Sequence, residues 1–268
     1  MSTAEHWDAT FPLVRLNGAG ARDFLQGQTT ADLRDAADGE LRQSCWLTAT
    51  GRLRALLELR LDSEGADVLV LAGNPETLRV GFDQVIFPAD RVRLGEGRQQ
   101  RRVQPLTPDA APTWLLSGET LPTAMEGSNA LDPLETERWR LQQGFPPGDG
   151  ELSGDTNPLE LGLTDRISLD KGCYLGQETM AKLAGKGGVK QQLRCWRCEA
   201  PLQNGERLFA DDVRAGVVTS VQALPDDTWI GLALVRRQSL PLDALSGPAG
   251  QRVVISRPTL FQDPPGSD

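Results

Sequence analysis

The sequence has almost none of the histidine that acid–base catalysis and metal binding most often use. Its single histidine, His6, lies in an N-terminal stretch that we expect to be frayed. Histidine-based catalysis is therefore nearly excluded, and a histidine-rich metal site is excluded outright. No other metal site is predicted, because no second cysteine pair accompanies Cys195 and Cys198 to complete a four-cysteine zinc site.

Long apolar runs are also missing. The first residues, from Met1 to Trp7, have neither the basic region nor the apolar stretch of a signal peptide. No run reaches the roughly 18 apolar residues that a membrane helix needs. We therefore expect a cytoplasmic protein with no membrane partner, and in that compartment the four cysteines should be reduced and not paired in disulfides.

Lysine is scarce, and all the lysines of the chain lie close together, at Lys171, Lys182, Lys186 and Lys190. The only tyrosine, Tyr174, lies among them, and arginine supplies the positive charge elsewhere. The segment 171–194 has five basic residues against one acid, Glu178, whereas the whole chain carries a net charge of −9. A basic patch on an acidic protein suits a small anionic ligand better than direct binding of nucleic acid. A solvated basic face with no ligand is the alternative.

The first part of the chain mixes helical and strand patterns, which indicates an α+β fold. Strands are expected at Leu13–Leu16, Arg52–Leu61, Val68–Leu71, Val92–Leu94 and Trp114–Leu116, and helices at Ala21–Gln26, Pro75–Phe87 and Thr136–Gln143. Residues 95–133, rich in Gly, Pro, Arg and Glu, are expected to be peripheral. Asn157-Pro158-Leu159-Glu160 is typical of a capped helix start, with Asn157 as the N-cap and Glu160 at N3.

The character of the chain changes after Gly188. Strands are expected at Gln191–Glu199, Arg207–Ala210, Ala215–Val221, Trp229–Val235 and Arg252–Ile255, with a hairpin turn at Asn204-Gly205. A small β-barrel is the expected fold of this part. We therefore predict an α+β region of two intertwined subdomains over residues 1–190 and a β-barrel over residues 191–268, with a disordered tail at 262–268.

One octapeptide combines many reactive and ligand-binding groups, and it reads Lys171-Gly172-Cys173-Tyr174-Leu175-Gly176-Gln177-Glu178. It leads into a helix predicted over Gln177–Ala184, and a helix N-terminus attracts anions. Cys173 is the candidate reactive group, because a helix N-terminus and a nearby lysine both favour thiolate chemistry. A buried structural cysteine is the alternative.

The remaining candidate residues have structural alternatives as well. Glu160, Glu178 and Gln177 could bind the donor and acceptor edge of a heterocycle, or they could cap helices. Cys195 and Cys198 form a lone CxxC pair in a predicted strand. Residues three apart in a strand point to opposite faces, which favours structural cysteines over a redox or cluster-binding pair.

The octapeptide, followed by Ala181-Lys182, resembles the signature of the YgfZ-type folate-binding proteins, which are relatives of the glycine-cleavage T-protein, an aminomethyltransferase. Other segments are similar to that superfamily in the expected order, at Phe24–Asp32, Trp139–Pro146, Asn157–Leu163, Gly216–Ser220 and Gly231–Arg236. Of these, Trp139–Pro146 and Asn157–Leu163 resemble T-protein segments around the folate pocket.

The resemblance implies three packed units around a central folate pocket, the last being the β-barrel, with tetrahydrofolate or a derivative as the ligand. The folate-binding set on this interpretation is Lys171, Gly172, Tyr174, Gly176, Gln177, Glu178, Lys182, Arg140 and Glu160, with Cys173 as the candidate catalytic residue. Lysine or arginine in this set would hold the glutamate tail, and Glu or Gln would bind the pterin. The implied role is support of iron–sulfur cluster assembly or repair, with an indirect effect on tRNA modification, so iron–sulfur client or assembly proteins are the expected partners.

One segment departs from the T-protein pattern. T-proteins carry two aspartates shortly after a glycine pair, and the matching stretch Gly51–Leu56 has Ala55 and Leu56 in their place. Glycine-cleavage aminomethyl transfer is therefore not expected, because general acid–base work needs a positioned titratable group. Two alternatives stay open: another folate-dependent aminomethyl or one-carbon transferase, and a thiol or cluster carrier that acts through Cys195 and Cys198, with Cys173.

Overall fold

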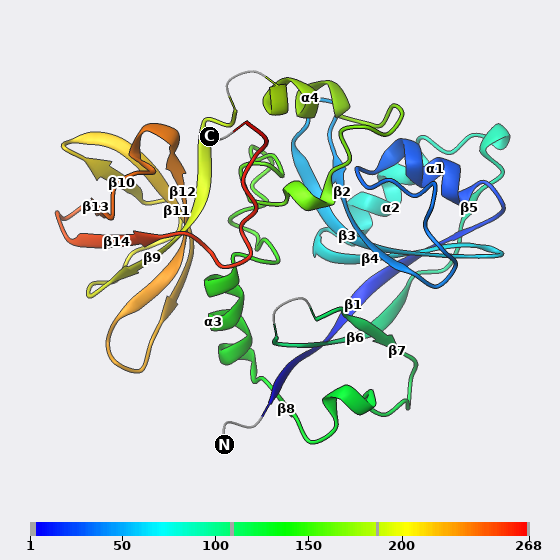
Figure 1. The fold of residues 1–268 in the computed structure, drawn as a ribbon, viewed down its shortest axis with the longest axis horizontal. Helices are drawn as coiled ribbons and strands as arrows, with labels where there is room; N and C mark the ends of the chain where they lie inside the picture. The colour runs from blue at the N-terminus through cyan, green and yellow to red at the C-terminus, as the bar shows by residue number, and fades with distance from the viewer. Residues whose placement is uncertain (1–3, 108–109, 186–187, 267–268) are drawn as a thin grey trace.

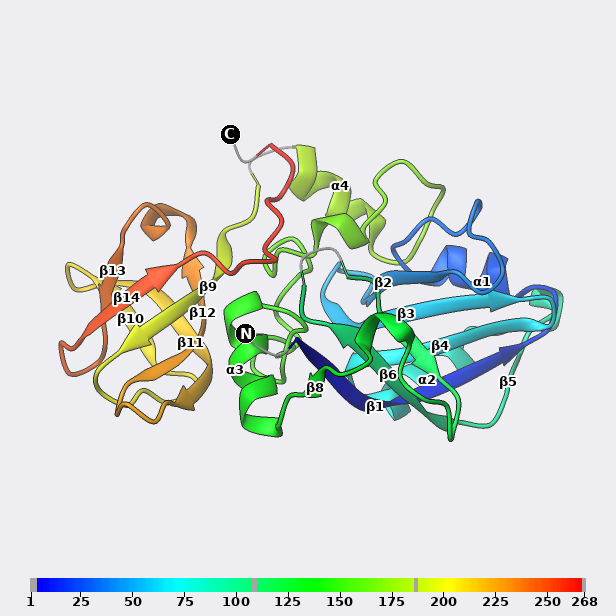
Figure 2. The same ribbon diagram turned by 60° about the horizontal axis from the view of Figure 1, so that its bottom comes forward.

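The protein consists of a large mixed sheet and a closed β-barrel, with a helix between them (Figure 1; Figure 2). The computed structural model describes residues 4–107, 110–185 and 188–266. The expected α+β class with a C-terminal barrel is confirmed. Within these described ranges, no helix combines the length and the apolarity needed to cross a bilayer.

The sheet is built around one long strand, β1 (Glu5–Asn17). The main strand order is β2-β3-β4-β1-β6-β7, and both β5 and β8 also pair with β1. The other strands are β2 (Leu41–Leu47), β3 (Leu53–Asp62), β4 (Gly65–Gly73), β5 (Arg93–Leu94), β6 (Arg98–Pro105), β7 (Thr113–Leu115) and β8 (Asn129–Ala130). β1 therefore holds together segments from four parts of the N-terminal half.

The central strands of the sheet are apolar on both faces. In β4, Val70 faces a core that includes residues of the helices α1 (Ala21–Gln28) and α2 (Pro75–Asp83). Its neighbour Leu71 faces a second core on the opposite side. That second core also contains Leu193 of the barrel, so it joins the sheet to the barrel.

The barrel closes in the order β10-β11-β12-β9-β14-β13. Its strands are β9 (Gln191–Cys198), β10 (Arg207–Ala210), β11 (Val213–Ala223), β12 (Trp229–Arg236), β13 (Ala244–Ser246) and β14 (Arg252–Ser256). Alternating residues of these strands fill an interior of its own around Trp196. The periodicity of the sequence therefore predicted the barrel because each strand buries one face inside it.

Helix α3 (Pro133–Gln143) lies between the sheet and the barrel (Figure 1). It begins with a reciprocal capping box, because Asp132 accepts from Glu135 N at 2.8 Å and Glu135 accepts from Asp132 N at 3.1 Å. The other helices are α4 (Gln177–Gly185) and the short η1 (Pro88–Asp90), η2 (Thr123–Met125), η3 (Thr164–Arg166) and η4 (Arg237–Ser239).

The chain after the barrel returns to the end of α3. Leu260 N donates to Gln143 O at 3.1 Å, and Gln262 N donates to Gly162 O at 3.0 Å. Pro264 is buried as well. The expectation of a disordered tail from residue 262 is therefore wrong as far as residue 266, because these backbone bonds fix the segment; residues 267 and 268 lie outside the described residues.

Two expectations for the N-terminal half are also wrong. His6 is not frayed: it lies in β1, is 2% exposed, and its Nδ1 lies 2.7 Å from Ser128 Oγ. Residues 95–133 are not peripheral throughout, because β6 within them pairs with β1 from His6 to Leu13. The polar composition of β6 hid this strand, since charged side chains there pair with partners across the sheet.

Two predicted helices also differ from the structure. The helix from Pro75 ends at Asp83, well before Phe87. Asn157 and Glu160 make the reciprocal capping bonds at 3.1 Å each, but only turns follow them up to Gly162, and no α-helix forms there. A capping pair therefore fixes one turn here, and Gly162 (φ 74°) then takes the chain out of the helical direction.

Candidate functional site

Lys171 is buried, and its ammonium group is hydrogen-bonded within the protein itself. Lys171 Nζ donates to Thr29 O at 2.7 Å and to Ala31 O at 2.6 Å, and the residue is 3% exposed. It also lies over the ring of Tyr174, 5.1 Å from the ring centroid. Burial lowers the pKa of Lys171 to about 8. The expected exposed basic patch does not include this lysine, which instead ties the octapeptide to the chain after α1.

Two other residues of the octapeptide support the same turn. Gln177 Nε2 donates to Lys171 O at 3.1 Å. Tyr174 is 6% exposed, and burial followed by the nearby Cys45 raises the pKa of its phenol to about 12. Within the described chain, its hydroxyl has no hydrogen-bond partner. These side chains face the protein interior and pack the turn in place.

Helix α4 begins directly against the loop between β2 and β3. Gly176 (φ 86°) comes so close that a Cβ there would lie 2.7 Å from Thr48 O. A Cβ on Gly51 would lie 2.7 Å from Thr179 Cβ of α4. The octapeptide therefore positions the loop that carries Arg52, while Gly172 has open space around it.

The two charged residues of α4 lie on its exposed side. Lys182 Nζ pairs with Glu178 Oε1 at 2.6 Å, and both side chains are largely exposed. An exposed pair of this spacing contributes little to stability. Lys186, which belonged to the expected basic patch, lies outside the described residues.

Cys173 is the exposed cysteine of the described chain. Cys45 is buried, and burial raises the pKa of its thiol to about 12. Cys195 packs outside the barrel with its Sγ 3.2 Å from Leu141 O, while Cys198 lies in the barrel core. The CxxC cysteines therefore point to opposite faces, as the strand period requires, and they cannot close on one metal or form one disulfide in this fold.

Arg140 lies at a third place, where α3 meets the barrel. Its guanidinium donates to Glu137 at 2.7 Å, to Glu151 at 3.2 Å and to Ser220 Oγ at 3.0 Å. Glu151 is fully buried and also accepts from Ser220. These bonds join α3 to the loop after it and to β11, so Arg140 lies apart from both Lys171 and Glu160.

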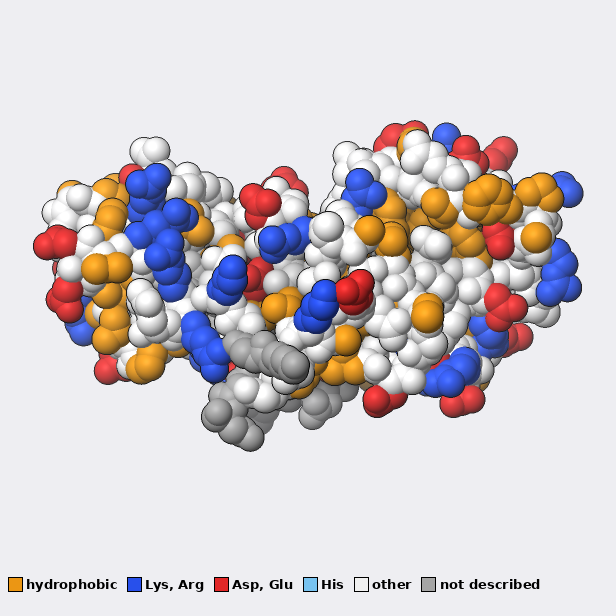
Figure 3. Space-filling model, turned by 90° about the horizontal axis from the view of Figure 1, so that it is seen from above, with side chains coloured by type: hydrophobic (Ala, Val, Ile, Leu, Met, Phe, Trp, Pro, Cys, Tyr) orange, Lys and Arg blue, Asp and Glu red, His pale blue; other side chains and the backbone are white. Residues whose placement is uncertain are grey.

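Glu160 lies in a cleft at the seam between sheet and barrel, which we name the basic cleft. Its volume is about 960 Å³, and its walls include Arg52, Glu160, Lys190, Gln191, Arg236 and Arg237. Burial raises the pKa of Glu160. Hydrogen bonds from the Asn157 backbone and the Gln191 side chain, together with the nearby cations, offset this rise only in part. Figure 3 shows basic side chains along this seam, where the surface narrows between the two halves.

A second cavity lies between the sheet, α3 and the C-terminal segment, and we name it the central cavity. Its volume is about 900 Å³, and its walls include Arg60, Trp114, Trp139, Gln143, Phe145 and Arg166. The Cζ atom of Arg60 lies 4.7 Å from the centroid of the Trp114 ring, and that of Arg166 lies 4.5 Å from the Phe145 ring. The cavity thus offers flat aromatic surfaces with a cation beside each of two rings.

A buried ion pair supports the wall of the central cavity. Arg102 Nη2 donates to Glu58 Oε1 at 2.8 Å, and both side chains are fully buried. Trp114 Nε1 donates to Glu58 at 3.0 Å, and Gln43 links Glu58 at 2.9 Å to Arg166 at 3.0 Å. Burial alone would raise the pKa of Glu58, but the Arg102 guanidinium and these hydrogen bonds together hold that pKa below its usual range. This polar network fixes the wall of the cavity, although Arg102 Nη1 is buried without a hydrogen-bond partner among the described residues.

Sequence reasoning placed the candidate residues at one site, and the structure separates them. Lys171, Tyr174 and Gln177 lie together in the interior, whereas Arg140 and Glu160 lie at two other places. The residues that line the central cavity were missed, except that Trp139, Gln143 and Phe145 lie in a segment that resembled the surroundings of a folate pocket. Arg60 and Arg166 stand out only through their stacking on rings that are distant in the sequence, and no local sequence pattern reveals such contacts.

Comparisons with known proteins first define the fold. The chain superposes on a solved structure of the glycine cleavage system aminomethyltransferase T from Bartonella henselae with a TM-score of 0.73, at 16% identity, covering 98% of this chain and 87% of that one. No protein-family model matches the chain. The fold is therefore that of the glycine-cleavage T-protein.

Proteins that are similar in sequence point to one group of proteins within this fold. The chain is 29% identical to the tRNA-modifying protein YgfZ of Serratia proteamaculans, over 83% of this chain and 81% of that protein. It is 25% identical to a putative chloroplastic transferase of Arabidopsis thaliana over 85% of its length, but it spans only 64% of that relative. A mitochondrial iron–sulfur cluster assembly factor of Mus musculus matches at 29% identity over 47% of this chain and 37% of its own length. In sequence the chain is therefore similar to the YgfZ proteins, and in fold it is similar to the T-protein.

Proposed function

We propose that this protein binds tetrahydrofolate or a derivative in the central cavity and acts as an accessory factor for iron–sulfur cluster assembly or repair, with an indirect effect on tRNA modification. The names of the YgfZ relatives and of the mouse assembly factor support the second half of this proposal. The T-protein fold and the chemistry of the cavity support the first half.

The observation that carries the ligand assignment is the pair of guanidinium–ring stacks on one cavity. Folate has a flat pterin, a flat aminobenzoyl ring and an anionic glutamate tail. Trp114, Trp139 and Phe145 offer surfaces for the flat rings. Arg60 and Arg166 offer charge for the tail, and the amide of Gln143 can both donate to and accept from the pterin edge.

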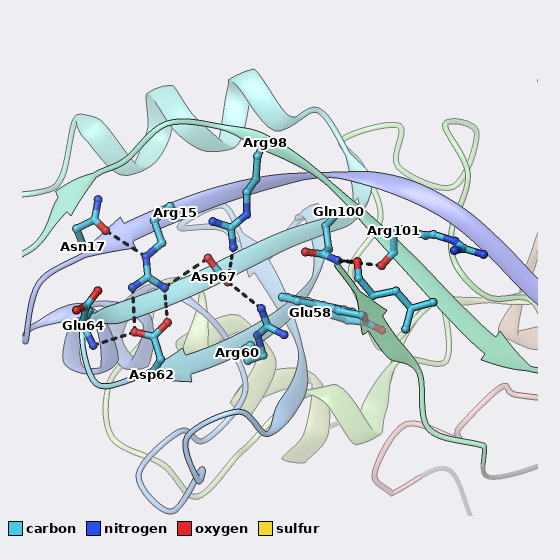
Figure 4. A network of polar contacts seen from close by, with 12 residues as sticks. Arg15, Asn17, Glu58, Arg60, Asp62, Glu64, Asp67, Arg98, Gln100 and Arg101 are labelled. Carbon is cyan, nitrogen blue, oxygen red and sulfur yellow. Dashed lines mark hydrogen bonds and ion pairs between the residues drawn. The ribbon is translucent and has the colours of Figure 1, made fainter. Parts of the chain in front are cut away.

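Arg60 can turn toward a ligand without leaving a buried charge unpaired. Its partner Asp67 is 2% exposed and also accepts from Arg98 at 2.7 Å and from Arg15 at 3.4 Å. Figure 4 shows these arginines converging on Asp67, with Arg60 at 3.1 Å. Since Asp67 keeps the two others, the cost of releasing Arg60 is small compared with that of breaking a single buried pair.

An accessory role fits the residues at the positions of the T-protein aspartates. Ala55 packs in the core below α1 and α2, and Leu56 is fully buried in the core that joins sheet and barrel. Neither can take or give a proton. The Arabidopsis relative carries the name of a putative transferase, so another folate-dependent one-carbon transfer is the second candidate, and it would have to use groups other than these.

The ligand assignment is tested by calorimetric titration with tetrahydrofolate under reducing conditions. We expect saturable binding to the wild type and a loss of at least about tenfold in affinity for Arg166→Gln, because a charge-assisted hydrogen bond is lost. Trp139→Leu should weaken binding as well. Arg197→Gln is the matched control, because Arg197 is an exposed barrel arginine paired only at the surface with Asp226.

The cellular role is tested separately. Loss of the gene should lower the activity of an iron–sulfur enzyme of the same cell, and the wild type and Arg197→Gln should restore it. Arg166→Gln should fail to restore it. Restoration by a variant that no longer binds tetrahydrofolate would separate the cellular role from the folate site.

A further inference from the structure

The basic cleft is built by three segments that are distant in the sequence. Arg52 comes from the loop between β2 and β3, and Glu160 comes from the turn after residue 157. Gln191 and Arg236 come from neighbouring barrel strands, where they are opposite each other in the β9–β12 register. The cleft therefore lies where the sheet packs against the barrel. Only the tertiary structure brings its side chains together.

Backbone hydrogen bonds hold these segments in register. Leu53 N donates to Thr156 O at 2.8 Å, which joins β3 to the turn. Leu193 N donates to Glu160 O at 2.8 Å, which joins the same turn to β9. Arg237 N donates to Lys190 O at 2.9 Å across the barrel strands. The walls of the cleft are thus fixed before any ligand binds.

The cleft has more cationic than anionic side chains. Arg52, Lys190, Arg236 and Arg237 face it, against Asp155 and Glu160. This surplus of positive charge lies on a protein whose net charge is −9. A concave site with a surplus of positive charge concentrates anions.

The number and kind of cations favour phosphate over a single carboxylate. A carboxylate carries one charge, whereas a phosphate monoester carries nearly two and presents three acceptor oxygens. Guanidinium groups bind phosphate through pairs of parallel hydrogen bonds, and lysine adds a point charge. The net charge of −9 disfavours a long polyanion, which would contact more of the protein surface than the cleft.

The carboxyl group of Glu160 adds a second element of recognition. Glu160 is 5% exposed and accepts from Asn157 N at 3.1 Å, which fixes its direction. Gln191 lies beside it in the same wall. A carboxyl and an amide side by side suit a ligand that carries neutral hydrogen-bonding groups as well as its phosphate.

We propose that the basic cleft is a second ligand site, separate from the central cavity, that binds a small phosphate-bearing molecule through Arg52, Lys190 and Arg236, with Glu160 and Gln191 contacting its neutral part. This proposal does not depend on folate binding, because the two cavities share no lining residue among those described.

The test is calorimetric titration of the full chain with pyrophosphate at constant ionic strength, with citrate as the carboxylate counterpart. We expect saturable binding of pyrophosphate that is at least about tenfold weaker in Arg52→Gln and in Lys190→Gln. Arg252→Gln, at an exposed barrel position outside the cleft, should bind like the wild type. Glu160→Gln should bind more tightly, because it removes a negative charge and keeps the acceptor oxygen; a purely structural role for Glu160 would not produce this gain.

Four results would overturn the proposal. Absence of saturable pyrophosphate binding to the folded wild type, or equal weakening by Arg252→Gln, would mean that the cleft is only a solvated basic surface. Citrate binding as tightly as pyrophosphate would overturn the choice of phosphate. Competition between pyrophosphate and tetrahydrofolate would show that the two sites are not separate, whereas loss of tetrahydrofolate binding alone would leave this proposal standing. Thermal unfolding of each variant checks that it is folded.

Discussion

The sheet and its seam with the barrel use charged side chains in opposite ways. In the sheet, Glu58 and Arg102 form a fully buried ion pair, and close to the sheet the buried ammonium of Lys171 is bonded to two carbonyls of the segment after α1. At the seam, Arg52 and Arg236 face a cleft, and Arg52 Nη1 also donates to Asp155 O at its wall. Charges of the first kind fix the shape of the protein, and charges of the second kind are available to a ligand. Composition alone cannot separate the two, which is why the scarce lysines suggested a single patch.

Replacing Glu58 in the sheet should have the largest effect on stability. In Glu58→Gln, the guanidinium of Arg102 stays buried without its counter-charge, so we expect the free energy of unfolding to fall by about 3–5 kcal/mol. Urea denaturation measures this. The matched control is Asp226→Asn, which removes an exposed partner of Arg197 and should cost about 1 kcal/mol or less. Equal losses of stability in the two variants would contradict the distinction between buried and exposed charges.

Lys171→Met should destabilise the protein by roughly 2–4 kcal/mol, because two buried carbonyls lose their donor. The pH dependence gives a separate signature. Burial lowers the pKa of Lys171 to about 8, while the unfolded chain keeps the proton up to the ordinary value of 10.5. The wild type should therefore gain stability relative to the variant as the pH rises from 8 toward 10.5. A constant difference over this range would show that the ammonium is not desolvated.

Glu160→Gln tests the seam through the pH dependence of stability as well, and here the expected change with pH has the opposite sign. Burial raises the pKa of Glu160, so the folded state binds this proton more tightly than the unfolded chain does. The contribution to stability is present below the ordinary carboxyl pKa and is lost as the pH rises through the raised one. Relative to the variant, the wild type should lose stability between about pH 4 and about pH 8. Unfolding curves at both pH values that shift in parallel would contradict a buried carboxyl.

Cys173→Ser should have the smallest effect on stability, within about 0.5 kcal/mol, because the side chain is exposed. Its effect on reactivity should be large. Titration of the native protein with a disulfide reagent at mildly alkaline pH should label Cys173 first and Cys45 last, since burial raises the pKa of the Cys45 thiol to about 12. Rapid labelling that persists in Cys173→Ser would move attention to Cys195.

The barrel could be predicted from the sequence because its strands alternate cleanly and turn residues such as Asn204-Gly205 and Pro225-Asp226 separate them. The predicted strand Arg207–Ala210 matches β10, and the others differ by a few residues at their ends. The full length of β1 could not be predicted, since its polar residues, such as Asp8, are paired across the sheet with residues of β6. Pairing partners so far apart leave no local pattern.

The candidate site was harder to predict than the fold. The resemblance drew attention to Trp139–Pro146, which does line the central cavity through Trp139 and Phe145. It could not show that the octapeptide turns inward, because burial of Lys171 depends on carbonyls more than a hundred residues earlier in the chain. A register shift between Trp46 and Leu47 also places Leu53 in a different core from Ala55, contrary to simple alternation.

The return of the chain after the barrel has a consequence for the order of synthesis. Thr259, Leu260 and Gln262 form part of the wall of the central cavity, and backbone bonds fix them against α3 and Gly162. A nascent chain on the ribosome can complete the sheet as soon as β8 has emerged, yet it cannot close this cavity until the barrel and the segment behind it have been translated. The ligand that fills the cavity would therefore bind only finished molecules, and truncated products would be left without it.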